Sequence, residues 1–151
     1  GGGITATRIH ILDAFVNLIG PVRRVSAQLL ERPPAPEPVD TLSVLLEFEN
    51  RVSGILCGVR STAQYFRVHV FGKEGSAEAI GDCELIVRMC DQTPQRLQFD
   101  RVDTLRCELE AFADAIEGLA PFPISSAQML GTIAALEAIL QSIETKGPAT
   151  L

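Results

Sequence analysis

The middle of the sequence, residues 41–100, alternates apolar with polar residues in short runs separated by turns. This period of two predicts β-strands, because successive side chains of a strand point to opposite faces of the sheet. Turns as short as Glu49-Asn50-Arg51 and Gly72-Lys73-Glu74-Gly75 can join only antiparallel neighbours. The pattern therefore predicts an antiparallel meander and argues against βαβ crossovers. The expected strands are residues 22–30, 41–48, 52–60, 66–71, 76–80, 83–89 and 96–100.

Helical periodicity precedes and follows this region. Apolar residues recur at helical spacing in residues 4–19 and 104–118, and Ser125-Ser126-Ala127-Gln128 matches a capping box that begins a final helix. One helix, about six to seven strands and two further helices predict an α+β fold: an open, mostly antiparallel sheet with helices packed on one face. The expected core-facing residues of the helices are Ile4, Ile11, Phe15 and Leu18, then Leu105, Leu109, Phe112, Ile116 and Leu119, and then Leu130, Ile133, Leu140 and Ile143.

The face of the sheet opposite the helices is expected to carry apolar residues as well. Ile55 and Leu56 are adjacent on one expected strand, so they point to opposite sides, as do Leu85 and Ile86 on another. An exposed sheet face with this much apolar surface is normally buried against a partner. We therefore expect a homodimer, or a higher homo-oligomer, formed through the sheet.

Composition limits the classes of function that remain. The 151 residues suit one domain over residues 1–151, and no apolar run approaches the roughly 20 residues that span a bilayer. The net charge is −6 and the arginines are scattered, which argues against nucleic-acid binding. The four cysteines form no C-x-x-C pair and no metal-binding spacing, so we expect reduced, mostly buried thiols in a cytoplasmic protein. The sequence lacks an initiator Met, and we expect it to begin inside a longer gene product or at a tag.

The first helix carries the one constellation that resembles chemistry. His10 and Asp13 lie three residues apart, so they share a helical face, and that face also carries Ala6 and Thr7. A glycine run, Gly1-Gly2-Gly3, precedes them and would let a ligand approach the backbone. An imidazole beside a carboxylate is suited to proton transfer near neutral pH, although a structural histidine fits the same pattern.

Other motifs have simpler interpretations. Residues 1–6 match G-x-G-x-x-A, but no strand precedes the glycines and no βαβ unit follows, so we reject a dinucleotide site there. His69 lies in mid-strand and is interpreted as a solvent-facing residue. Tyr65 stands at the start of a strand, where it could line a substrate cleft or could be an aromatic residue without function.

An ordered set of motifs resembles the C-terminal domain of the Gfo/Idh/MocA oxidoreductases. Gly-Gly followed by His10-Ile11-Leu12-Asp13 is similar to the family signature G-G-x(7)-H-x-x-D. The further matches, which cover essentially the whole chain in order, are Gly20-Pro21-Val22, Phe71-Gly72-Lys73-Glu74-Gly75-Ser76, residues 108–116, Phe122-Pro123-Ile124-Ser125 and the last helix with Gly147 at its end.

This resemblance implies a domain that supplies substrate contacts and the oligomer interface, preceded in the intact enzyme by an NAD(P)-binding Rossmann domain that this chain lacks. It implies His10 as the proton-transfer residue, with Asp13 orienting it, and a sugar, polyol or related hydroxyl or carbonyl compound as the substrate. Thr7, Arg8, Asp13 and Tyr65 are the expected substrate contacts. The chain itself is expected to bind no cofactor and no metal, and to be inactive alone.

The sequence departs from the family pattern at two positions. Ala6 stands four residues before His10, where the family often has an aspartate, and Arg8 replaces the usual glycine two residues before it. Arg8 could meet an anionic substrate, or it could be a solvated or ion-paired side chain. The missing aspartate leaves a second hypothesis open, a non-catalytic binding or assembly domain that keeps the fold without the chemistry.

Overall fold

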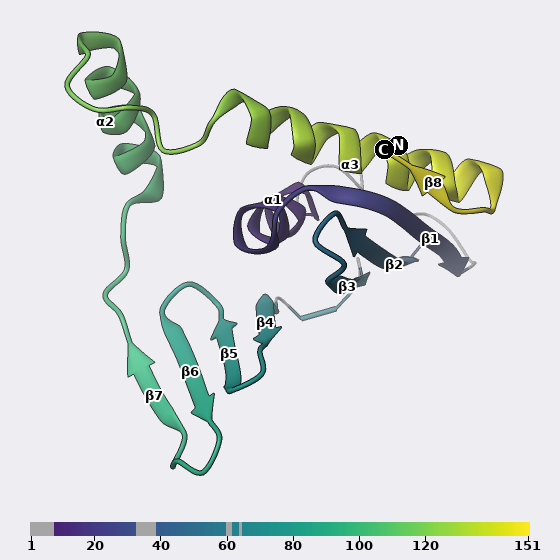
Figure 1. The fold of residues 1–151 in the computed structure, drawn as a ribbon, viewed down its shortest axis with the longest axis horizontal. Coiled ribbons are helices and arrows are strands. Elements are labelled where there is room, and N and C mark those ends of the chain that lie inside the picture. Colours follow the sequence, from purple (N-terminus) through teal and green to yellow (C-terminus); the bar gives the residue numbers. More distant parts are fainter. Residues whose placement is uncertain (1–7, 33–38, 60–61, 64) are drawn as a thin grey trace. The chain divides into compact units, whose positions relative to one another are not determined.

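The computed structural model describes residues 8–32, 39–59, 62–63 and 65–151. These residues form three helices and eight strands, in the order one helix, seven strands, two helices and a last short strand (Figure 1). The chain divides into two compact units, one from the described parts of residues 1–61 and 124–151, the other from those of residues 62–123. The elements are α1 (Arg8–Ile19), β1 (Val22–Arg32), β2 (Val39–Phe48), β3 (Ser53–Val59), β4 (Arg67–Phe71), β5 (Gly75–Ile80), β6 (Glu84–Met89), β7 (Gln95–Gln98), α2 (Thr104–Glu117), α3 (Ser126–Thr145) and β8 (Ala149–Thr150).

The first unit is a four-stranded antiparallel sheet in the order β3-β2-β1-β8, with α1 and α3 packed on one face. Alternation along β2 sends every second residue into the core, so the inward set is buried while Leu45 between them is 60% exposed. Ile55 and Leu56 confirm the opposite orientations expected of them, because Ile55 is 70% exposed and Leu56 only 2%. The inward residues of β2 are Leu42, Val44, Leu46 and Phe48.

A buried serine joins three parts of the first unit. Ser142 of α3, 1% exposed, accepts a hydrogen bond from the Ala27 N–H of β1 at 2.9 Å. Its hydroxyl donates in turn to the Gly147 carbonyl oxygen at 2.6 Å, in the turn before β8. The pairing of β1 with β8 covers only Arg24 and Val25, so the serine satisfies the next backbone donor where the short strand has ended.

The second unit contains another four-stranded antiparallel sheet, in the order β4-β5-β6-β7. The register divides its residues between two unlike faces. One face is apolar, with Val68, Ala79, Leu85 and Leu97 opposite one another across the four strands. The other face carries charged residues, among them Arg67, Glu78, Glu84, Arg88 and Arg96.

The helix α2 begins with a cap and ends with a glycine. Asp103 accepts a hydrogen bond from the Arg106 N–H at 3.1 Å, and Gly118 closes the helix at φ 74°, a conformation that favours glycine. None of the residues of α2 is buried. The predicted apolar stripe of α2 is therefore present but uncovered.

The α+β class and the antiparallel pairing are confirmed, and three details differ from expectation. The described strands form two four-stranded sheets, where one sheet was expected. The strand β8 was not predicted, because a pattern of two residues carries no detectable period. The predicted inner faces of α1 and α3 were wrong in part. In α1, Leu18 of the predicted inner face is exposed, while Leu12 and Val16 are buried. In α3, Leu130, Ile133 and Leu140 of the predicted inner face are exposed, and the buried residues are Thr132, Ala135, Ala138, Ile139 and Ser142.

Candidate functional site

The helix α1 presents His10 at the surface of the first unit. Its buried residues, Leu12 and Val16, lie one turn apart and anchor the helix in the core. His10 is exposed and belongs to the outer side of the same helix. The imidazole is thus accessible to a ligand and is carried on a helix that the core holds in place.

Hydrogen bonds to α3 fix the position of α1 along its length. The buried Thr132 hydroxyl donates to Asp13 Oδ1 at 3.0 Å, and Gln128 Nε2 donates to Asn17 Oδ1 at 3.2 Å. Both pairs are spaced by four residues on each helix, as expected for two antiparallel helices in contact. The carboxylate of Asp13 is therefore engaged by α3. Within the residues that the structure describes, it forms no hydrogen bond to His10.

The remaining predicted substrate contacts lie in different parts of the chain. Thr7 and the glycine run at residues 1–3 lie outside the described residues. Arg8 is the first residue of α1. Tyr65 is exposed and belongs to the second unit. Of the predicted site residues, Arg8, His10 and Asp13 share the helix α1.

A cluster of charged residues on the second sheet was missed from the sequence. Glu78, 7% exposed, pairs through Oε1 with Arg67 Nη1 at 3.4 Å and through Oε2 with Arg88 Nη1 at 2.8 Å. The hydrogen bond from Arg88, with lesser contributions from the nearby charges of Arg88, His69 and Arg67, lowers the pKa of Glu78 below its ordinary value of 4.5, against the opposing effect of burial.

His69 borders this cluster. It does not face open solvent, which differs from the prediction made from the sequence. It lies directly opposite Glu78 in the register and stacks on Phe71, with ring centroids 3.9 Å apart. Its Nε2 atom is buried and finds no hydrogen-bond partner among the described residues. One face of the sheet carries Arg67 and His69 together with Glu78 and Arg88. This follows from the pairing of the strands, so the alternation within each strand could not reveal it.

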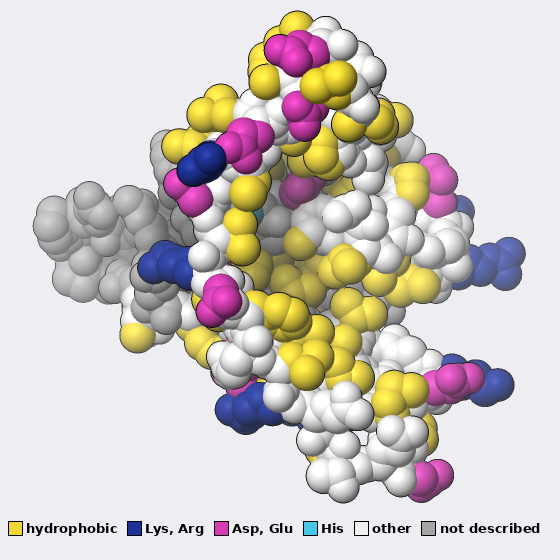
Figure 2. Space-filling view, turned by 90° about the vertical axis from the view of Figure 1, so that its left-hand side faces the viewer, with side chains coloured by type: hydrophobic (Ala, Val, Ile, Leu, Met, Phe, Trp, Pro, Cys, Tyr) yellow, Lys and Arg dark blue, Asp and Glu magenta, His cyan; other side chains and the backbone are white. Residues whose placement is uncertain are grey.

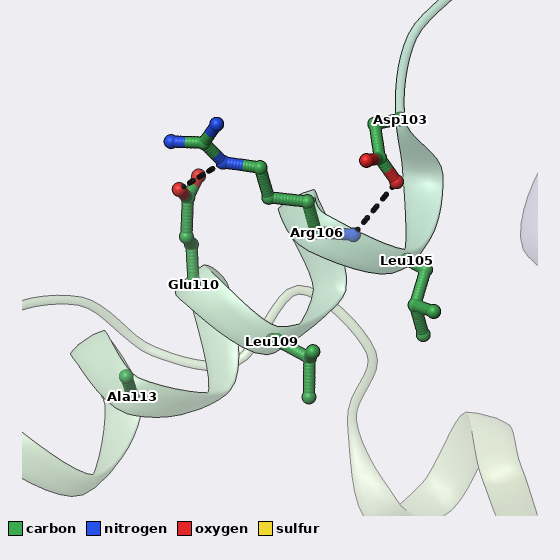
Figure 3. Close-up of a pocket in the computed structure, with 6 residues that line it drawn as sticks. All are labelled: Asp103, Leu105, Arg106, Leu109, Glu110 and Ala113. Atoms are coloured by element: carbon green, nitrogen blue, oxygen red, sulfur yellow. Dashed lines mark hydrogen bonds and ion pairs between the residues drawn. The ribbon is translucent and has the colours of Figure 1, made fainter.

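Among the described residues, one surface hollow lies along α2 and another on the second sheet, and their linings contain no predicted site residue. One, of about 350 Å³, lies along α2 between Leu105, Leu109 and Ala113 on one side and the Arg106–Glu110 ion pair on the other (Figure 3). The second, of about 440 Å³, lies on the apolar face of the second sheet beside the turn at residues 72–75. Both belong to the second unit.

The described residues contain no group of His, Cys, Asp and Glu side chains that could hold a metal ion. No described helix is long and apolar enough to cross a membrane. The four cysteines are free thiols, as expected, but the expectation of burial was wrong. Cys57, Cys90 and Cys107 are exposed and Cys83 is half-buried, because each lies at an outward position of a strand, in a turn or on the uncovered helix α2.

Comparisons with known proteins agree on the fold. A family model described as the GFO/IDH/MocA C-terminal domain matches residues 1–78. The comparison with curated protein sequences gives no match. Solved structures under 25% identical are similar over nearly all of this chain, which in turn spans about half the length of each.

Three of these structures illustrate the range of sequence identity and structural similarity. An aldose–aldose oxidoreductase of Caulobacter crescentus, complexed with glycerol, has a TM-score of 0.83 at 16% identity, over 100% of this chain and 48% of that one. Biliverdin reductase of Synechocystis, complexed with biliverdin and NADP⁺, has a TM-score of 0.80 at 19% identity, over 95% and 47%. An oxidoreductase of Thermotoga maritima has a TM-score of 0.80 at 21% identity, over 99% and 44%.

Proposed function

This chain belongs to the GFO/IDH/MocA family, and from that premise we propose that it is the C-terminal, substrate-binding and oligomerisation domain of an NAD(P)-dependent oxidoreductase. The observation that carries the proposal is the exposed imidazole of His10 on a helix that is hydrogen-bonded to its surroundings from its middle to its carboxyl end. Asp13 and Asn17 tie α1 to α3, and Asn50 Nδ2 donates to the Ile19 carbonyl oxygen at 2.8 Å where the helix ends. A positioned imidazole of this kind is suited to general acid–base catalysis.

The proposed role of His10 is to move one proton. Oxidation of a hydroxyl group releases a proton from the substrate oxygen, and reduction of a carbonyl group consumes one. His10 accepts that proton in the first direction and donates it in the second. Asp13 acts through the helix, because its carboxylate fixes α1 against Thr132 and so fixes the place of the imidazole.

The described residues do not fit a dinucleotide. Such a site needs a strand that leads into the amino-terminal end of a helix, whereas β1 follows α1 here and the next helix in the chain is α2, after seven strands. We therefore assign NAD(P) to the full-length protein and no cofactor contact to this chain. The NADP⁺ held by the Synechocystis biliverdin reductase supports a cofactor of this class.

We propose a small hydroxylated or carbonyl substrate such as a sugar or a polyol. Support comes from the resemblance and from the glycerol bound to the Caulobacter enzyme. Thr7 and Arg8 precede His10 in the sequence by three residues and by two, and we propose them, together with Tyr65, as substrate contacts. A cytoplasmic location belongs to the same proposal, because all four cysteines are free.

The oligomer interface is proposed at the outer face of the first sheet. Leu45 is 60% and Ile55 70% exposed, and they lie directly opposite each other on β2 and β3. Light scattering should show a dimer at micromolar concentration, which Leu45→Glu/Ile55→Glu should convert to a monomer. Gln141→Glu is a matched control that adds charge at an exposed position of α3, which packs on the other face of this sheet. A monomeric parent protein would refute this interface.

Substitution of His10 in the full-length enzyme tests the catalytic role. His10→Ala should lower kcat by on the order of 10²–10⁴ with a smaller change in KM, because the imidazole acts on the reacting proton. Leu18→Ala, at an exposed position of the same helix, is the matched control and should leave kcat unchanged. Turnover of His10→Ala near that of the parent enzyme would remove the role.

A non-catalytic binding or assembly domain is the second candidate. The engagement of Asp13 by Thr132, instead of by His10, favours it, and so does Ala6 at the position of the family aspartate. The gene sequence upstream of this chain separates the two hypotheses. A G-x-G-x-x-G/A unit and a catalytic lysine there would support the enzyme, and their absence would support the assembly domain.

A further inference from the structure

Thr132 of α3 is a polar residue buried in the first unit, where only 4% of it is exposed. It is the reverse of the apolar side chains that Figure 2 shows at the surface of α2, in the upper part of the view. A buried hydroxyl costs free energy unless it is hydrogen-bonded, and a branched side chain lowers helix propensity. Packing and helix formation alone would therefore favour alanine here, as at Ala135 one turn later.

The Thr132 hydroxyl forms its hydrogen bond with α1 and not with its own helix. A threonine in a helix commonly donates to the carbonyl oxygen four residues earlier, as Thr145 does to Gln141 at 2.9 Å. Thr132 instead donates to Asp13 Oδ1 at 3.0 Å. Among the described residues, this is the only hydrogen bond of the Asp13 side chain, and no described cation pairs with it. The orientation of the carboxylate therefore depends on one hydroxyl group.

Asp13 is the one acidic residue of α1, and it follows His10 by three residues, so the two side chains are neighbours on the helix surface. The last torsion angle of an aspartate side chain is broad, and a carboxylate without a partner turns readily about it. The bond from Thr132 holds Oδ1 on the side of α3. Oδ2 is then the oxygen that can meet the imidazole or a substrate bound to it.

We propose that Thr132 is a positioning residue for the proton transfer assigned to His10, and that it acts through Asp13. The inference rests on the proposed function, to which it adds a residue 119 positions away from Asp13 in the chain. The hydroxyl is buried and already engaged, so it reaches the reaction only through the carboxylate that it holds. Because Ala6 replaces the family aspartate, Asp13 is the carboxylate that remains to align the imidazole.

Two substitutions of Thr132 in the full-length enzyme separate the hydroxyl from the shape of the side chain. Thr132→Val keeps the shape and removes the donor, so it should lower kcat about 10- to 100-fold, the loss expected when a reacting group is misplaced by about 1 Å. KM should change less than about threefold, because the substrate still binds the same surface. Thr132→Ser keeps the donor and should return kcat to within about threefold of the parent enzyme. Equal losses in the valine and serine variants, or an unchanged kcat in Thr132→Val, would overturn the positioning role.

Ser142→Ala is the matched control, because Ser142 is another buried hydroxyl residue of α3 and its hydrogen bonds lead to β1 and to the turn before β8. This variant loses buried hydrogen bonds without changing a hydrogen bond of α1. Measured per folded molecule, with the folded fraction taken from circular dichroism at the assay temperature, its kcat should equal that of the parent enzyme. A loss of kcat as large as that of Thr132→Val would assign both effects to general destabilisation and would overturn the proposal.

The double variant Asp13→Ala/Thr132→Val tests whether Thr132 acts through Asp13. It should be no slower than Asp13→Ala alone, since the hydroxyl position then has no carboxylate to hold, and a further loss of about tenfold or more would overturn the inference. His10→Ala distinguishes this failure from failure of the proposed function. If His10→Ala is inactive while Thr132→Val turns over like the parent enzyme, only the positioning role is wrong. Turnover of His10→Ala near that of the parent enzyme would refute both.

Discussion

Ser142→Ala should destabilise the first unit far more than the loss of one oxygen atom suggests. The serine hydroxyl accepts from the Ala27 N–H at 2.9 Å and donates to the Gly147 carbonyl oxygen at 2.6 Å. Alanine is nearly isosteric, so the change creates little cavity, but it leaves a donor and an acceptor without a partner at a site that is 1% exposed. Each unsatisfied buried group costs about 1–3 kcal/mol, so we expect a loss of roughly 2–4 kcal/mol, at the lower end because Gly147 is half-buried.

Two assays measure this loss. The protein has no tryptophan and one tyrosine, so denaturant unfolding is best followed by circular dichroism. Because the two units can unfold separately, hydrogen exchange of the Ala27 amide supplies a local readout and should accelerate by a factor of ten or more. Thr145→Ala is the matched control, since Thr145 also donates to a backbone carbonyl, that of Gln141 at 2.9 Å, but is exposed. If Ser142→Ala were no more destabilising than this control, with Ala27 still protected, the reasoning would be refuted.

The second sheet offers two further predictions. Gly75→Ala should destabilise this sheet by about 1–3 kcal/mol or more, because a Cβ there would overlap the Arg88 carbonyl oxygen, whereas Gly72→Ala in the same turn meets its nearest atom at 3.6 Å and should cost far less. Equal midpoints of thermal unfolding for the two variants would contradict this. The lowered pKa of Glu78 means that its ion pairs stabilise the sheet above pH 4.5 and that this contribution is lost as the pH falls through the depressed pKa. Glu78→Gln should flatten the acid limb of stability against pH, and an unchanged limb would show that other groups control it.

The alternating strands and the capping box could be predicted because they depend on neighbours in sequence. Ser125 accepts from the Gln128 N–H at 3.2 Å, and the Ser125 N–H donates to Gln128 Oε1 at 2.9 Å, so the predicted capping box is confirmed. The inner face of α3 could not be found in the same way. Its bulky residues suggested a face centred on Leu130 and Ile133, but the helix packs through small residues such as Ala135, which allow close approach to α1 and the sheet.

The polar groups that organise each unit depend on contacts between residues distant in sequence. Thr132 meets Asp13 across 119 positions, and Ser142 meets Ala27 across 115. In the second sheet, the place of Glu78 among its arginines follows from strand register, which a one-residue slip would reverse. Of the candidate site, the sequence could indicate His10 as the chemical group. It could not indicate that Asp13 would be held by α3.

The two hydrogen bonds between α1 and α3 work as a latch against sliding. Displacement of α1 by a single residue, about 1.5 Å along its axis, would separate Thr132 from Asp13 and Gln128 from Asn17 at the same time. At intermediate displacements of α1 along its axis neither hydrogen bond forms, so the helix has one favoured position relative to α3. A ligand that binds the imidazole would therefore meet a group whose position is already fixed. Its binding energy would align the ligand and would not be spent on moving the helix.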